Sequence, residues 1–140
     1  EIIEEFMFEL FSTPRYCQWN IHVHYAQYTG EWNVEGKSYD RSNVKAYNTY
    51  GTGRVNGYKI MEETLNLRDV RIFDYIEDGN GMKTALLNKK ETAIAQGKQE
   101  LIKQAFADWI WSDPERREQL TKLYNEKFNS IRPASMTAAT

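Results

Sequence analysis

Helical periodicity dominates the last third of the chain. Asn88 stands where an N-cap residue belongs, and Glu91, three residues later, completes a capping box. Apolar side chains then recur at helical spacing: Ile94, Leu101, Ile102, Ala105, Phe106, Trp109 and Ile110. This spacing places them on one face of an α-helix. The pattern predicts a helix of about six turns.

A second helical pattern follows at once. Ser112 and Asp113 are residue types that cap helices, and Pro114 suits a first turn because proline has no N–H to donate there. A second apolar stripe then runs through Leu120, Leu123, Tyr124, Phe128 and Ile131. We expect two long helices joined by a tight corner, which must pack on something shared.

The start of the chain changes from helical to strand periodicity. Residues 2–11 have apolar side chains at helical spacing, and the predicted helix ends before Pro14. From there the period becomes two, and one face holds Trp19, Ile21, Val23 and Tyr25. A turn at residues 28–30 leads to a second alternating run at residues 31–35, which predicts a β-hairpin.

A long connection separates this hairpin from the next elements. Residues 36–53 are rich in Gly, Ser, Asn and Tyr, and one short helix is expected near residues 42–50. Helical spacing returns over residues 54–65. Residues 70–87 predict a strand from Val70, a Gly- and Asn-rich turn and a returning strand. The fold class predicted is α+β: two small antiparallel β-hairpins packed with helices, ending in a long-helix pair.

The length of 140 residues fits one domain, and nine Tyr, six Phe and four Trp exclude a disordered chain. We expect a single domain over residues 1–133. Residues 134–140 have no pattern, and we expect a tail that is disordered or left over from cloning. Because the chain begins at Glu1 rather than Met and already looks packed there, we expect a piece of a longer protein.

Cysteine content, hydropathy and charge limit the cellular location and the binding partners that we expect. The single cysteine, Cys17, cannot form an internal disulfide, which is typical of the cytoplasm, and we expect it to be buried. No stretch reaches the roughly 18 consecutive apolar residues of a membrane span, so no membrane partner is expected. A net charge of −2 means that nucleic-acid binding requires a local basic patch.

Glycines gather before the predicted helix at residues 54–65. Gly51, Gly53 and Gly57 allow a nucleoside-phosphate site, since glycines ahead of a helix let backbone N–H groups approach a phosphate. Their spacing fits neither the P-loop nor the dinucleotide fingerprint. We interpret them as a helix start that needs positive φ, with the phosphate site as the alternative.

His22 and His24 project from one face of the first predicted hairpin, as metal-binding His-x-His pairs do. Glu31 or Glu35 can supply a third ligand from the opposite strand. Solvent-facing histidines are also common on antiparallel sheets, so we predict no metal site and keep the two histidines as alternative candidates.

Charge is polarised along the sequence. Residues 1–35 hold six acidic residues and one basic residue, Arg15. Residues 37–60 hold one acidic residue, Asp40, and five basic ones: Lys37, Arg41, Lys45, Arg54 and Lys59. Tyrosines such as Tyr50 interleave with these cations, a mixture able to contact phosphates and stack on bases. On the long helix the set extends to Lys89, Lys90, Lys98 and Lys103.

Six strings carry a family resemblance. They are Thr49-Tyr50-Gly51, Leu65-Asn66-Leu67-Arg68-Asp69-Val70-Arg71-Ile72, Leu87-Asn88-Lys89-Lys90-Glu91-Thr92, Phe106-Ala107-Asp108-Trp109-Ile110-Trp111, Asp113-Pro114-Glu115-Arg116-Arg117 and Tyr124-Asn125-Glu126-Lys127-Phe128-Asn129-Ser130. Together they resemble the very large helicase and DNA-methylase proteins carried by conjugative and other mobile elements of Gram-positive bacteria. The resemblance runs to Arg132-Pro133.

In that family, this region looks like the segment just ahead of a Swi/Snf-type superfamily 2 helicase core, downstream of an adenine-specific methyltransferase region. The resemblance implies DNA as the parent protein's substrate, ATP and S-adenosylmethionine as its cofactors, and a bacterial cytoplasmic location. The helicase and methyltransferase domains of the same chain are the implied partners. None of the family's catalytic motifs is present here, so residues 1–133 are expected to be an accessory domain without catalytic residues or a cofactor of its own.

The leading hypothesis is a non-catalytic domain that positions DNA beside a helicase motor. Its predicted DNA contacts are Lys37, Arg41, Lys45, Tyr50, Arg54, Lys59, Lys89 and Lys90. The first alternative is a structural spacer that docks neighbouring domains, because Trp109 and Trp111 cannot both face the same helix stripe. The second is a metal-dependent nuclease built on His22 and His24.

Overall fold

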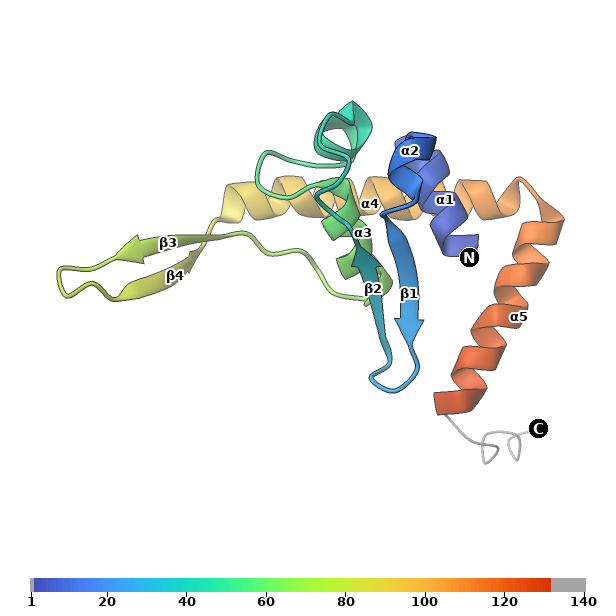
Figure 1. Cartoon of the computed structure of the whole chain (residues 1–140). Helices are drawn as coiled ribbons and strands as arrows, with labels where there is room; N and C mark the ends of the chain where they lie inside the picture. Colours follow the sequence, from blue (N-terminus) through green and yellow to red (C-terminus); the bar gives the residue numbers. More distant parts are fainter. Residues whose placement is uncertain (1, 132–140) are drawn as a thin grey trace.

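The computed structural model describes residues 2–131, without the side chains of residues 123, 124 and 126–131. The order of elements is α1 (Ile2–Phe11), α2 (Arg15–Gln18), β1 (His22–Ala26), β2 (Glu31–Glu35), the π-helix η1 (Lys45–Thr49), α3 (Gly57–Leu65), β3 (Phe73–Glu77), β4 (Lys83–Leu87), α4 (Lys89–Trp111) and α5 (Pro114–Ile131) (Figure 1). β1 pairs with β2 and β3 with β4, each antiparallel, so the predicted α+β fold is confirmed. The predicted tail at residues 134–140 lies outside the described residues.

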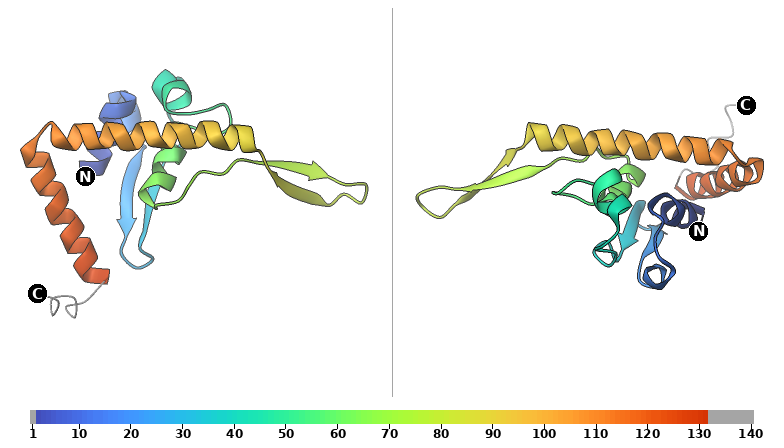
Figure 2. Two further views of the ribbon diagram at one scale, coloured as in Figure 1. Left: turned by 180° about the vertical axis from the view of Figure 1, so that it is seen from behind. Right: turned by 90° about the horizontal axis from the view of Figure 1, so that it is seen from above.

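Helix α4 runs across most of the molecule, and the other elements lie on one side of it (Figure 2). The β3–β4 hairpin extends beyond the N-terminal end of α4, whereas α5 leaves its C-terminal end at a sharp corner. No described helix is long and apolar enough to cross a membrane.

The core forms where α1 and α3 pack against each other and against α4. Met7 and Phe11 of α1 are fully buried, as are Tyr58 of α3 and Ile102 of α4. The Phe11 ring meets the Tyr58 ring edge-on, with centroids 4.9 Å apart. Burying a side chain of this size stabilises the fold by about 1.5–3 kcal/mol, so this contact ties the two helices together.

The first hairpin follows its predicted alternation. Val23 pairs with Val34 and Tyr25 with Trp32, and Val34 is fully buried. Placing Trp19 on the same apolar face was wrong, because its side chain is 79% exposed. The strand begins only at His22, and residues before it form α2 and a turn in which the Asn20 N–H donates to the Cys17 carbonyl. Strand alternation therefore does not extend back to Trp19.

Asn88 caps helix α4 as predicted, with the Glu91 N–H donating to Asn88 Oδ1 at 3.0 Å. The second half of the predicted capping box is replaced, because the Asn88 N–H donates to the Ile72 carbonyl at 2.8 Å. Its buried face differs from the predicted stripe: Ile94 and Leu101 are exposed. The buried side chains are Thr92, Ala95, Gln99, Ile102, Trp109 and Ile110. The N-terminal half of α4 thus buries polar as well as apolar groups.

The reason lies in residues 68–72, an extended segment against α4. Thr92 Oγ1 accepts from the Ile72 N–H at 2.9 Å, and Gln96 Nε2 donates to the Val70 carbonyl at 3.1 Å. Gln99 Oε1 accepts from the Val70 N–H at 2.9 Å. Side chains of α4 therefore satisfy backbone groups that a neighbouring strand would otherwise pair. The predicted start of a strand at Val70 is corrected to Phe73, where pairing with Leu87 begins.

The second hairpin is exposed along both strands apart from the half-buried Asp74, so helices pack with it at its base and do not cover it. Its turn follows prediction: Asp78 Oδ1 accepts from the N–H groups of Asn80 and Met82, and Gly81 has a φ of 79°. At the base, Asn88 Nδ2 donates to Asp74 Oδ2 at 3.0 Å. The hairpin is therefore held at its base and free at its tip.

Helix α5 begins after the predicted capping corner, where Asp113 Oδ1 accepts from the Glu115 N–H at 2.9 Å. Leu120 of its predicted stripe packs against the core. The Leu123, Tyr124, Phe128 and Ile131 side chains lie outside the described part of the structure. Arg116 of α5 stacks over the Trp109 ring, 4.2 Å from its centroid, which fixes the start of α5 against α4.

Candidate functional site

Two of the predicted DNA-binding cations surround a buried carboxylate. Lys37 Nζ lies 2.8 Å from Glu62 Oε2, and Lys59 Nζ lies 3.1 Å from Glu62 Oε1. Glu62 is 7% exposed and also accepts from the Val34 N–H at 2.9 Å. Burial alone would raise the pKa of Glu62, but these hydrogen bonds hold it below its usual value. Lys37 and Lys59 therefore stabilise the contact between β2 and α3.

Arg54 and Tyr50, two further predicted contacts, also make internal interactions. The Arg54 guanidinium lies 2.9 Å from Asp74 Oδ1 and donates to the Phe73 carbonyl at 2.9 Å, so it fastens the second hairpin. The Tyr50 ring is half-buried, with its centroid 5.8 Å from that of Phe11. Packing accounts for Tyr50, and ion pairing accounts for Arg54.

Three other cations donate to carbonyl or hydroxyl oxygens rather than to carboxylates. Arg41 Nε donates to the Ser38 carbonyl, and Lys45 Nζ donates to Ser12 Oγ at 2.9 Å. Lys98 Nζ donates to the Thr49 carbonyl at 3.1 Å, which joins α4 to the end of η1. We call the following residues the basic surface: Arg41, Lys45, Lys89, Lys90 and Lys98. Among the described residues none of the five forms an ion pair.

Asp40, the acidic residue within the basic stretch, is buried and hidden from the surface. It accepts hydrogen bonds from the Tyr58 hydroxyl at 2.9 Å and from the Asn43 amide, and the Cys17 thiol lies 3.7 Å from it. Burial and then Asp40 raise the pKa of Cys17, so the thiol stays protonated. Burial is also the main cause that raises the pKa of Tyr58. The cluster anchors the segment carrying Arg41 and Lys45 to the core.

The two histidines contact different acids. His24 Nε2 lies 3.0 Å from Glu35 Oε1, as the predicted cross-strand placement allows. His22 instead lies 3.8 Å from Glu4 of α1 through Nδ1, and its Nε2 lies 2.9 Å from the Trp19 carbonyl. Among the side chains that the structure describes, no group of three or more His, Cys, Asp and Glu residues is arranged to hold a metal ion. This geometry gives the nuclease alternative no support.

The glycines at residues 51–57 do not provide the predicted positive φ at the helix start. Positive φ is found at Gly30, Gly36 and Gly81, not at Gly51, Gly53 or Gly57. A Cβ on Gly57 would lie 2.9 Å from Phe11 Cζ, so this glycine is required by close packing between α3 and α1. The helix start is capped by Asn56, whose Oδ1 accepts from the Lys59 N–H at 3.0 Å.

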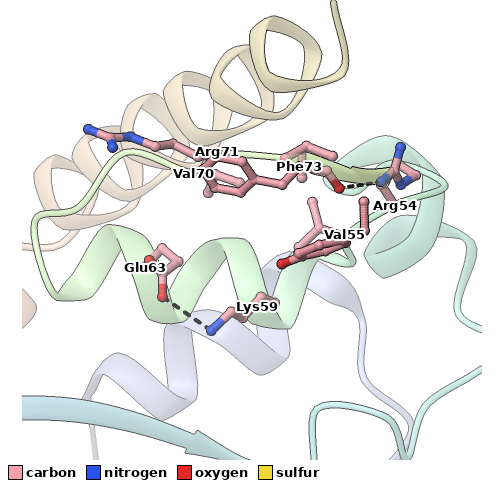
Figure 3. A pocket seen from close by; sticks show the side chains of 9 residues that line it. Arg54, Val55, Lys59, Glu63, Val70, Arg71 and Phe73 are labelled. Carbon is pink, nitrogen blue, oxygen red and sulfur yellow. Dashed lines mark hydrogen bonds and ion pairs between the residues drawn. The ribbon is translucent and has the colours of Figure 1, made fainter. Parts of the chain in front are cut away.

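A cleft of about 400 Å³ lies between α3 and the start of the second hairpin (Figure 3). Its lining residues are Arg54, Val55, Lys59, Glu63, Val70, Arg71, Ile72, Phe73 and Tyr75. Lys59 and Glu63 of α3 form one wall and residues 70–73 the other, with Arg54 and Arg71 toward opposite ends. This volume falls in the range of small-molecule sites.

Prediction of DNA contacts from the basic stretch missed three members of this cleft: Arg71, Phe73 and Tyr75. The three alternate with Val70 and Ile72 in the sequence, a period-two signal that places them together. The signal did not indicate a site, because the opposite wall comes from α3, and the alternation does not show that the chain turns back after Leu65 to face this helix.

Comparison with known proteins places the chain in a family. A family model described as Domain of unknown function (DUF8437) matches residues 1–130. No curated protein and no solved structure matches the chain. Because the match covers nearly the whole chain, this protein belongs to the DUF8437 family.

Proposed function

We propose that this chain is a non-catalytic domain that positions DNA, with the basic surface as its phosphate-binding site. The observation that carries the proposal is the contact between Lys98 and the Thr49 carbonyl, which brings lysines of α4 beside the segment of Arg41 and Lys45. Cations without a carboxylate partner keep their full charge for a phosphate. Asp40 does not oppose them at the surface, because it is buried.

This proposal narrows the predicted set of contacts. Lys37, Arg54 and Lys59 are engaged by Glu62, Glu63 and Asp74, so a phosphate would have to compete with these carboxylates. Lys89 and Lys90 stand in the first turn of α4 beside Glu91, and we include them as outer contacts.

The parent protein is part of the proposal. The resemblance to helicase and DNA-methylase proteins of mobile elements supports a place beside a superfamily 2 helicase core in the bacterial cytoplasm. ATP and S-adenosylmethionine would then serve the neighbouring domains rather than this one. The DUF8437 description itself names no function, so this placement rests on the resemblance.

Fluorescence anisotropy of labelled duplex DNA, titrated at several salt concentrations, tests the phosphate contacts. Five contacts predict a slope of log K against log salt of about −4.5 on duplex DNA. Reversing three charges at once, with Arg41→Glu, Lys45→Glu and Lys98→Glu, should make this slope shallower by about 2–3 and weaken binding strongly at low salt.

The matched control is Arg15→Glu, Lys83→Glu and Lys122→Glu, which changes the net charge equally on α2, the second hairpin and α5. All three are exposed. If both triple variants lost affinity equally, net charge rather than the basic surface would explain binding. Absence of any binding to duplex or single-stranded DNA at low salt would refute the proposal.

A docking spacer is a second candidate function, and the exposure of Trp111 favours it. Trp111 is 70% exposed at the corner between α4 and α5, and its ring is covered on one side by Arg117, 4.6 Å from the ring centroid. Exposed tryptophan is characteristic of contact surfaces. This corner would meet a neighbouring domain of the longer protein.

A further inference from the structure

The cleft beside the second hairpin combines an apolar floor with exposed aromatic side chains. Val70 and Ile72 are buried beneath it. Tyr75 is 69% exposed although it lines the cleft, so its ring is available for contact. An apolar floor beside an exposed tyrosine ring suits the face of a planar aromatic ligand.

The outer edge of β3 adds polar recognition. The Asn88 N–H donates to the Ile72 carbonyl and the Asp78 N–H to the Met82 carbonyl, which fixes the hydrogen-bonded pairs of this antiparallel hairpin. The alternation then turns the backbone groups of Phe73 and Tyr75 away from β4. Arg54, which lines the cleft, donates to the Phe73 carbonyl on this edge. The Tyr75 backbone therefore offers a donor and an acceptor beside the cleft.

An arginine lies at each end of the cleft. Arg54 is paired with Asp74, so a phosphate here would share the guanidinium with this carboxylate and use the donors that bond neither Asp74 nor Phe73. Arg71 is exposed and forms no ion pair within the described residues. The two cations and the apolar floor between them match a ligand with a planar ring flanked by anionic groups, which describes a nucleotide within a strand.

We propose that this cleft binds one unpaired nucleotide of single-stranded DNA, with the base stacked on Tyr75 and the flanking phosphates near Arg54 and Arg71. The inference rests on the proposed DNA-positioning function and adds the form of DNA recognised. Duplex DNA cannot present a base face to the cleft, because its bases are stacked and paired. The basic surface binds phosphates of either form.

Anisotropy measurements with a labelled thymidine 20-mer and with a mixed-sequence duplex of equal length separate the two sites. Tyr75→Ala should weaken binding of the single strand by roughly 5- to 100-fold and leave duplex binding unchanged. Tyr75→Phe should keep most of the single-strand affinity, because it keeps the ring. Tyr28→Ala is the matched control, since Tyr28 is fully exposed in the turn of the first hairpin.

Unchanged single-strand affinity in Tyr75→Ala, with DNA binding otherwise intact, would overturn the cleft proposal and leave the proposed function standing. Loss of duplex and single-strand binding together in this variant would also overturn it. If the wild-type chain bound neither DNA, the proposed function and the cleft proposal would both fail. Competition with thymidine monophosphate tells a nucleotide within a strand from a free nucleotide. If the monophosphate displaced the 20-mer at equal nucleotide concentration, the proposal of a strand-bound nucleotide would be overturned in favour of a free nucleotide.

Discussion

At the scale of single residues, Glu62 joins two parts of the fold through one buried carboxylate. It accepts from the Val34 backbone of β2 and from two lysines, one on each side of it in the fold. Removing one partner of a buried ion pair is costly because the remaining charge stays desolvated. Lys37 and Lys59 therefore have a structural role, which is to neutralise this buried carboxylate.

Glu62→Gln should reduce the free energy of unfolding by about 2 kcal/mol at pH 7, since the amide keeps the shape but loses the charge. The pKa of Glu62 is lowered in the folded state, so its stabilisation is present above the usual value of 4.5 and is lost as pH falls below it. Urea unfolding at pH 7 and in steps down to acidic pH measures both effects.

The control is Glu118→Gln on α5, whose side chain is exposed. It should change stability by less than about 0.5 kcal/mol at either pH. A stability difference between wild type and Glu62→Gln that stayed constant below pH 4.5 would contradict the assigned role of the charge.

At the scale of elements, α4 takes the place of a strand for residues 68–72. Gln99 is 2% exposed, and its amide bonds three groups: the Val70 N–H, the Arg68 carbonyl and the Thr64 hydroxyl. One face of α4 carries Thr92, Gln96 and Gln99, which are four and three residues apart. These side chains form hydrogen bonds with backbone groups of this segment. The helix thereby holds the cleft wall that carries Arg71.

Gln99→Leu should lower the free energy of unfolding by about 2 kcal/mol, because it leaves the buried Val70 N–H and the part-buried Arg68 carbonyl without their partner. Hydrogen exchange should accelerate at residues 68–72 more than in α1. Gln104→Leu on the exposed face of the same helix is the control, with a change below about 0.5 kcal/mol. Equal effects of the two substitutions would show that the hydrogen bonds from Gln99 to residues 68–70 do not contribute to stability.

At the scale of the whole molecule, two tryptophans two residues apart have different surroundings. Trp109 is buried, donates to Glu9 at 2.9 Å and stacks under Arg116, so it joins α1, α4 and α5. Trp111 faces outward at the corner. One tryptophan holds the described elements together, and the other is exposed.

Trp109→Ala should therefore cost about 3–5 kcal/mol of stability, and Trp111→Ala less than about 1 kcal/mol. Thermal or urea unfolding of the two variants measures the difference. If the chain is a docking spacer as proposed, Trp111→Ala should weaken its binding to the domain that it docks. A large loss of stability for Trp111→Ala in this chain alone would assign Trp111 to the internal packing and remove that support.

The types of element could be read from the sequence because their signals are local. Asn88 and Glu91 lie within one turn of each other, and the period-two runs at residues 22–26 and 31–35 are adjacent in the chain. Capping and periodicity require no knowledge of distant residues. Hence the α+β fold and the helix pair were predictable.

The sequence by itself thus determined the longer helices, the two hairpins and the presence of a basic stretch, but not the short helix α2. Only the tertiary structure decided which cations are free: Lys37 meets Glu62, 25 residues away, whereas Lys45 meets a hydroxyl. It also decided that α4 buries Gln99 instead of Leu101, because the helix packs on a backbone segment with unpaired polar groups. Partners distant in sequence set charge and burial, and no local pattern records them.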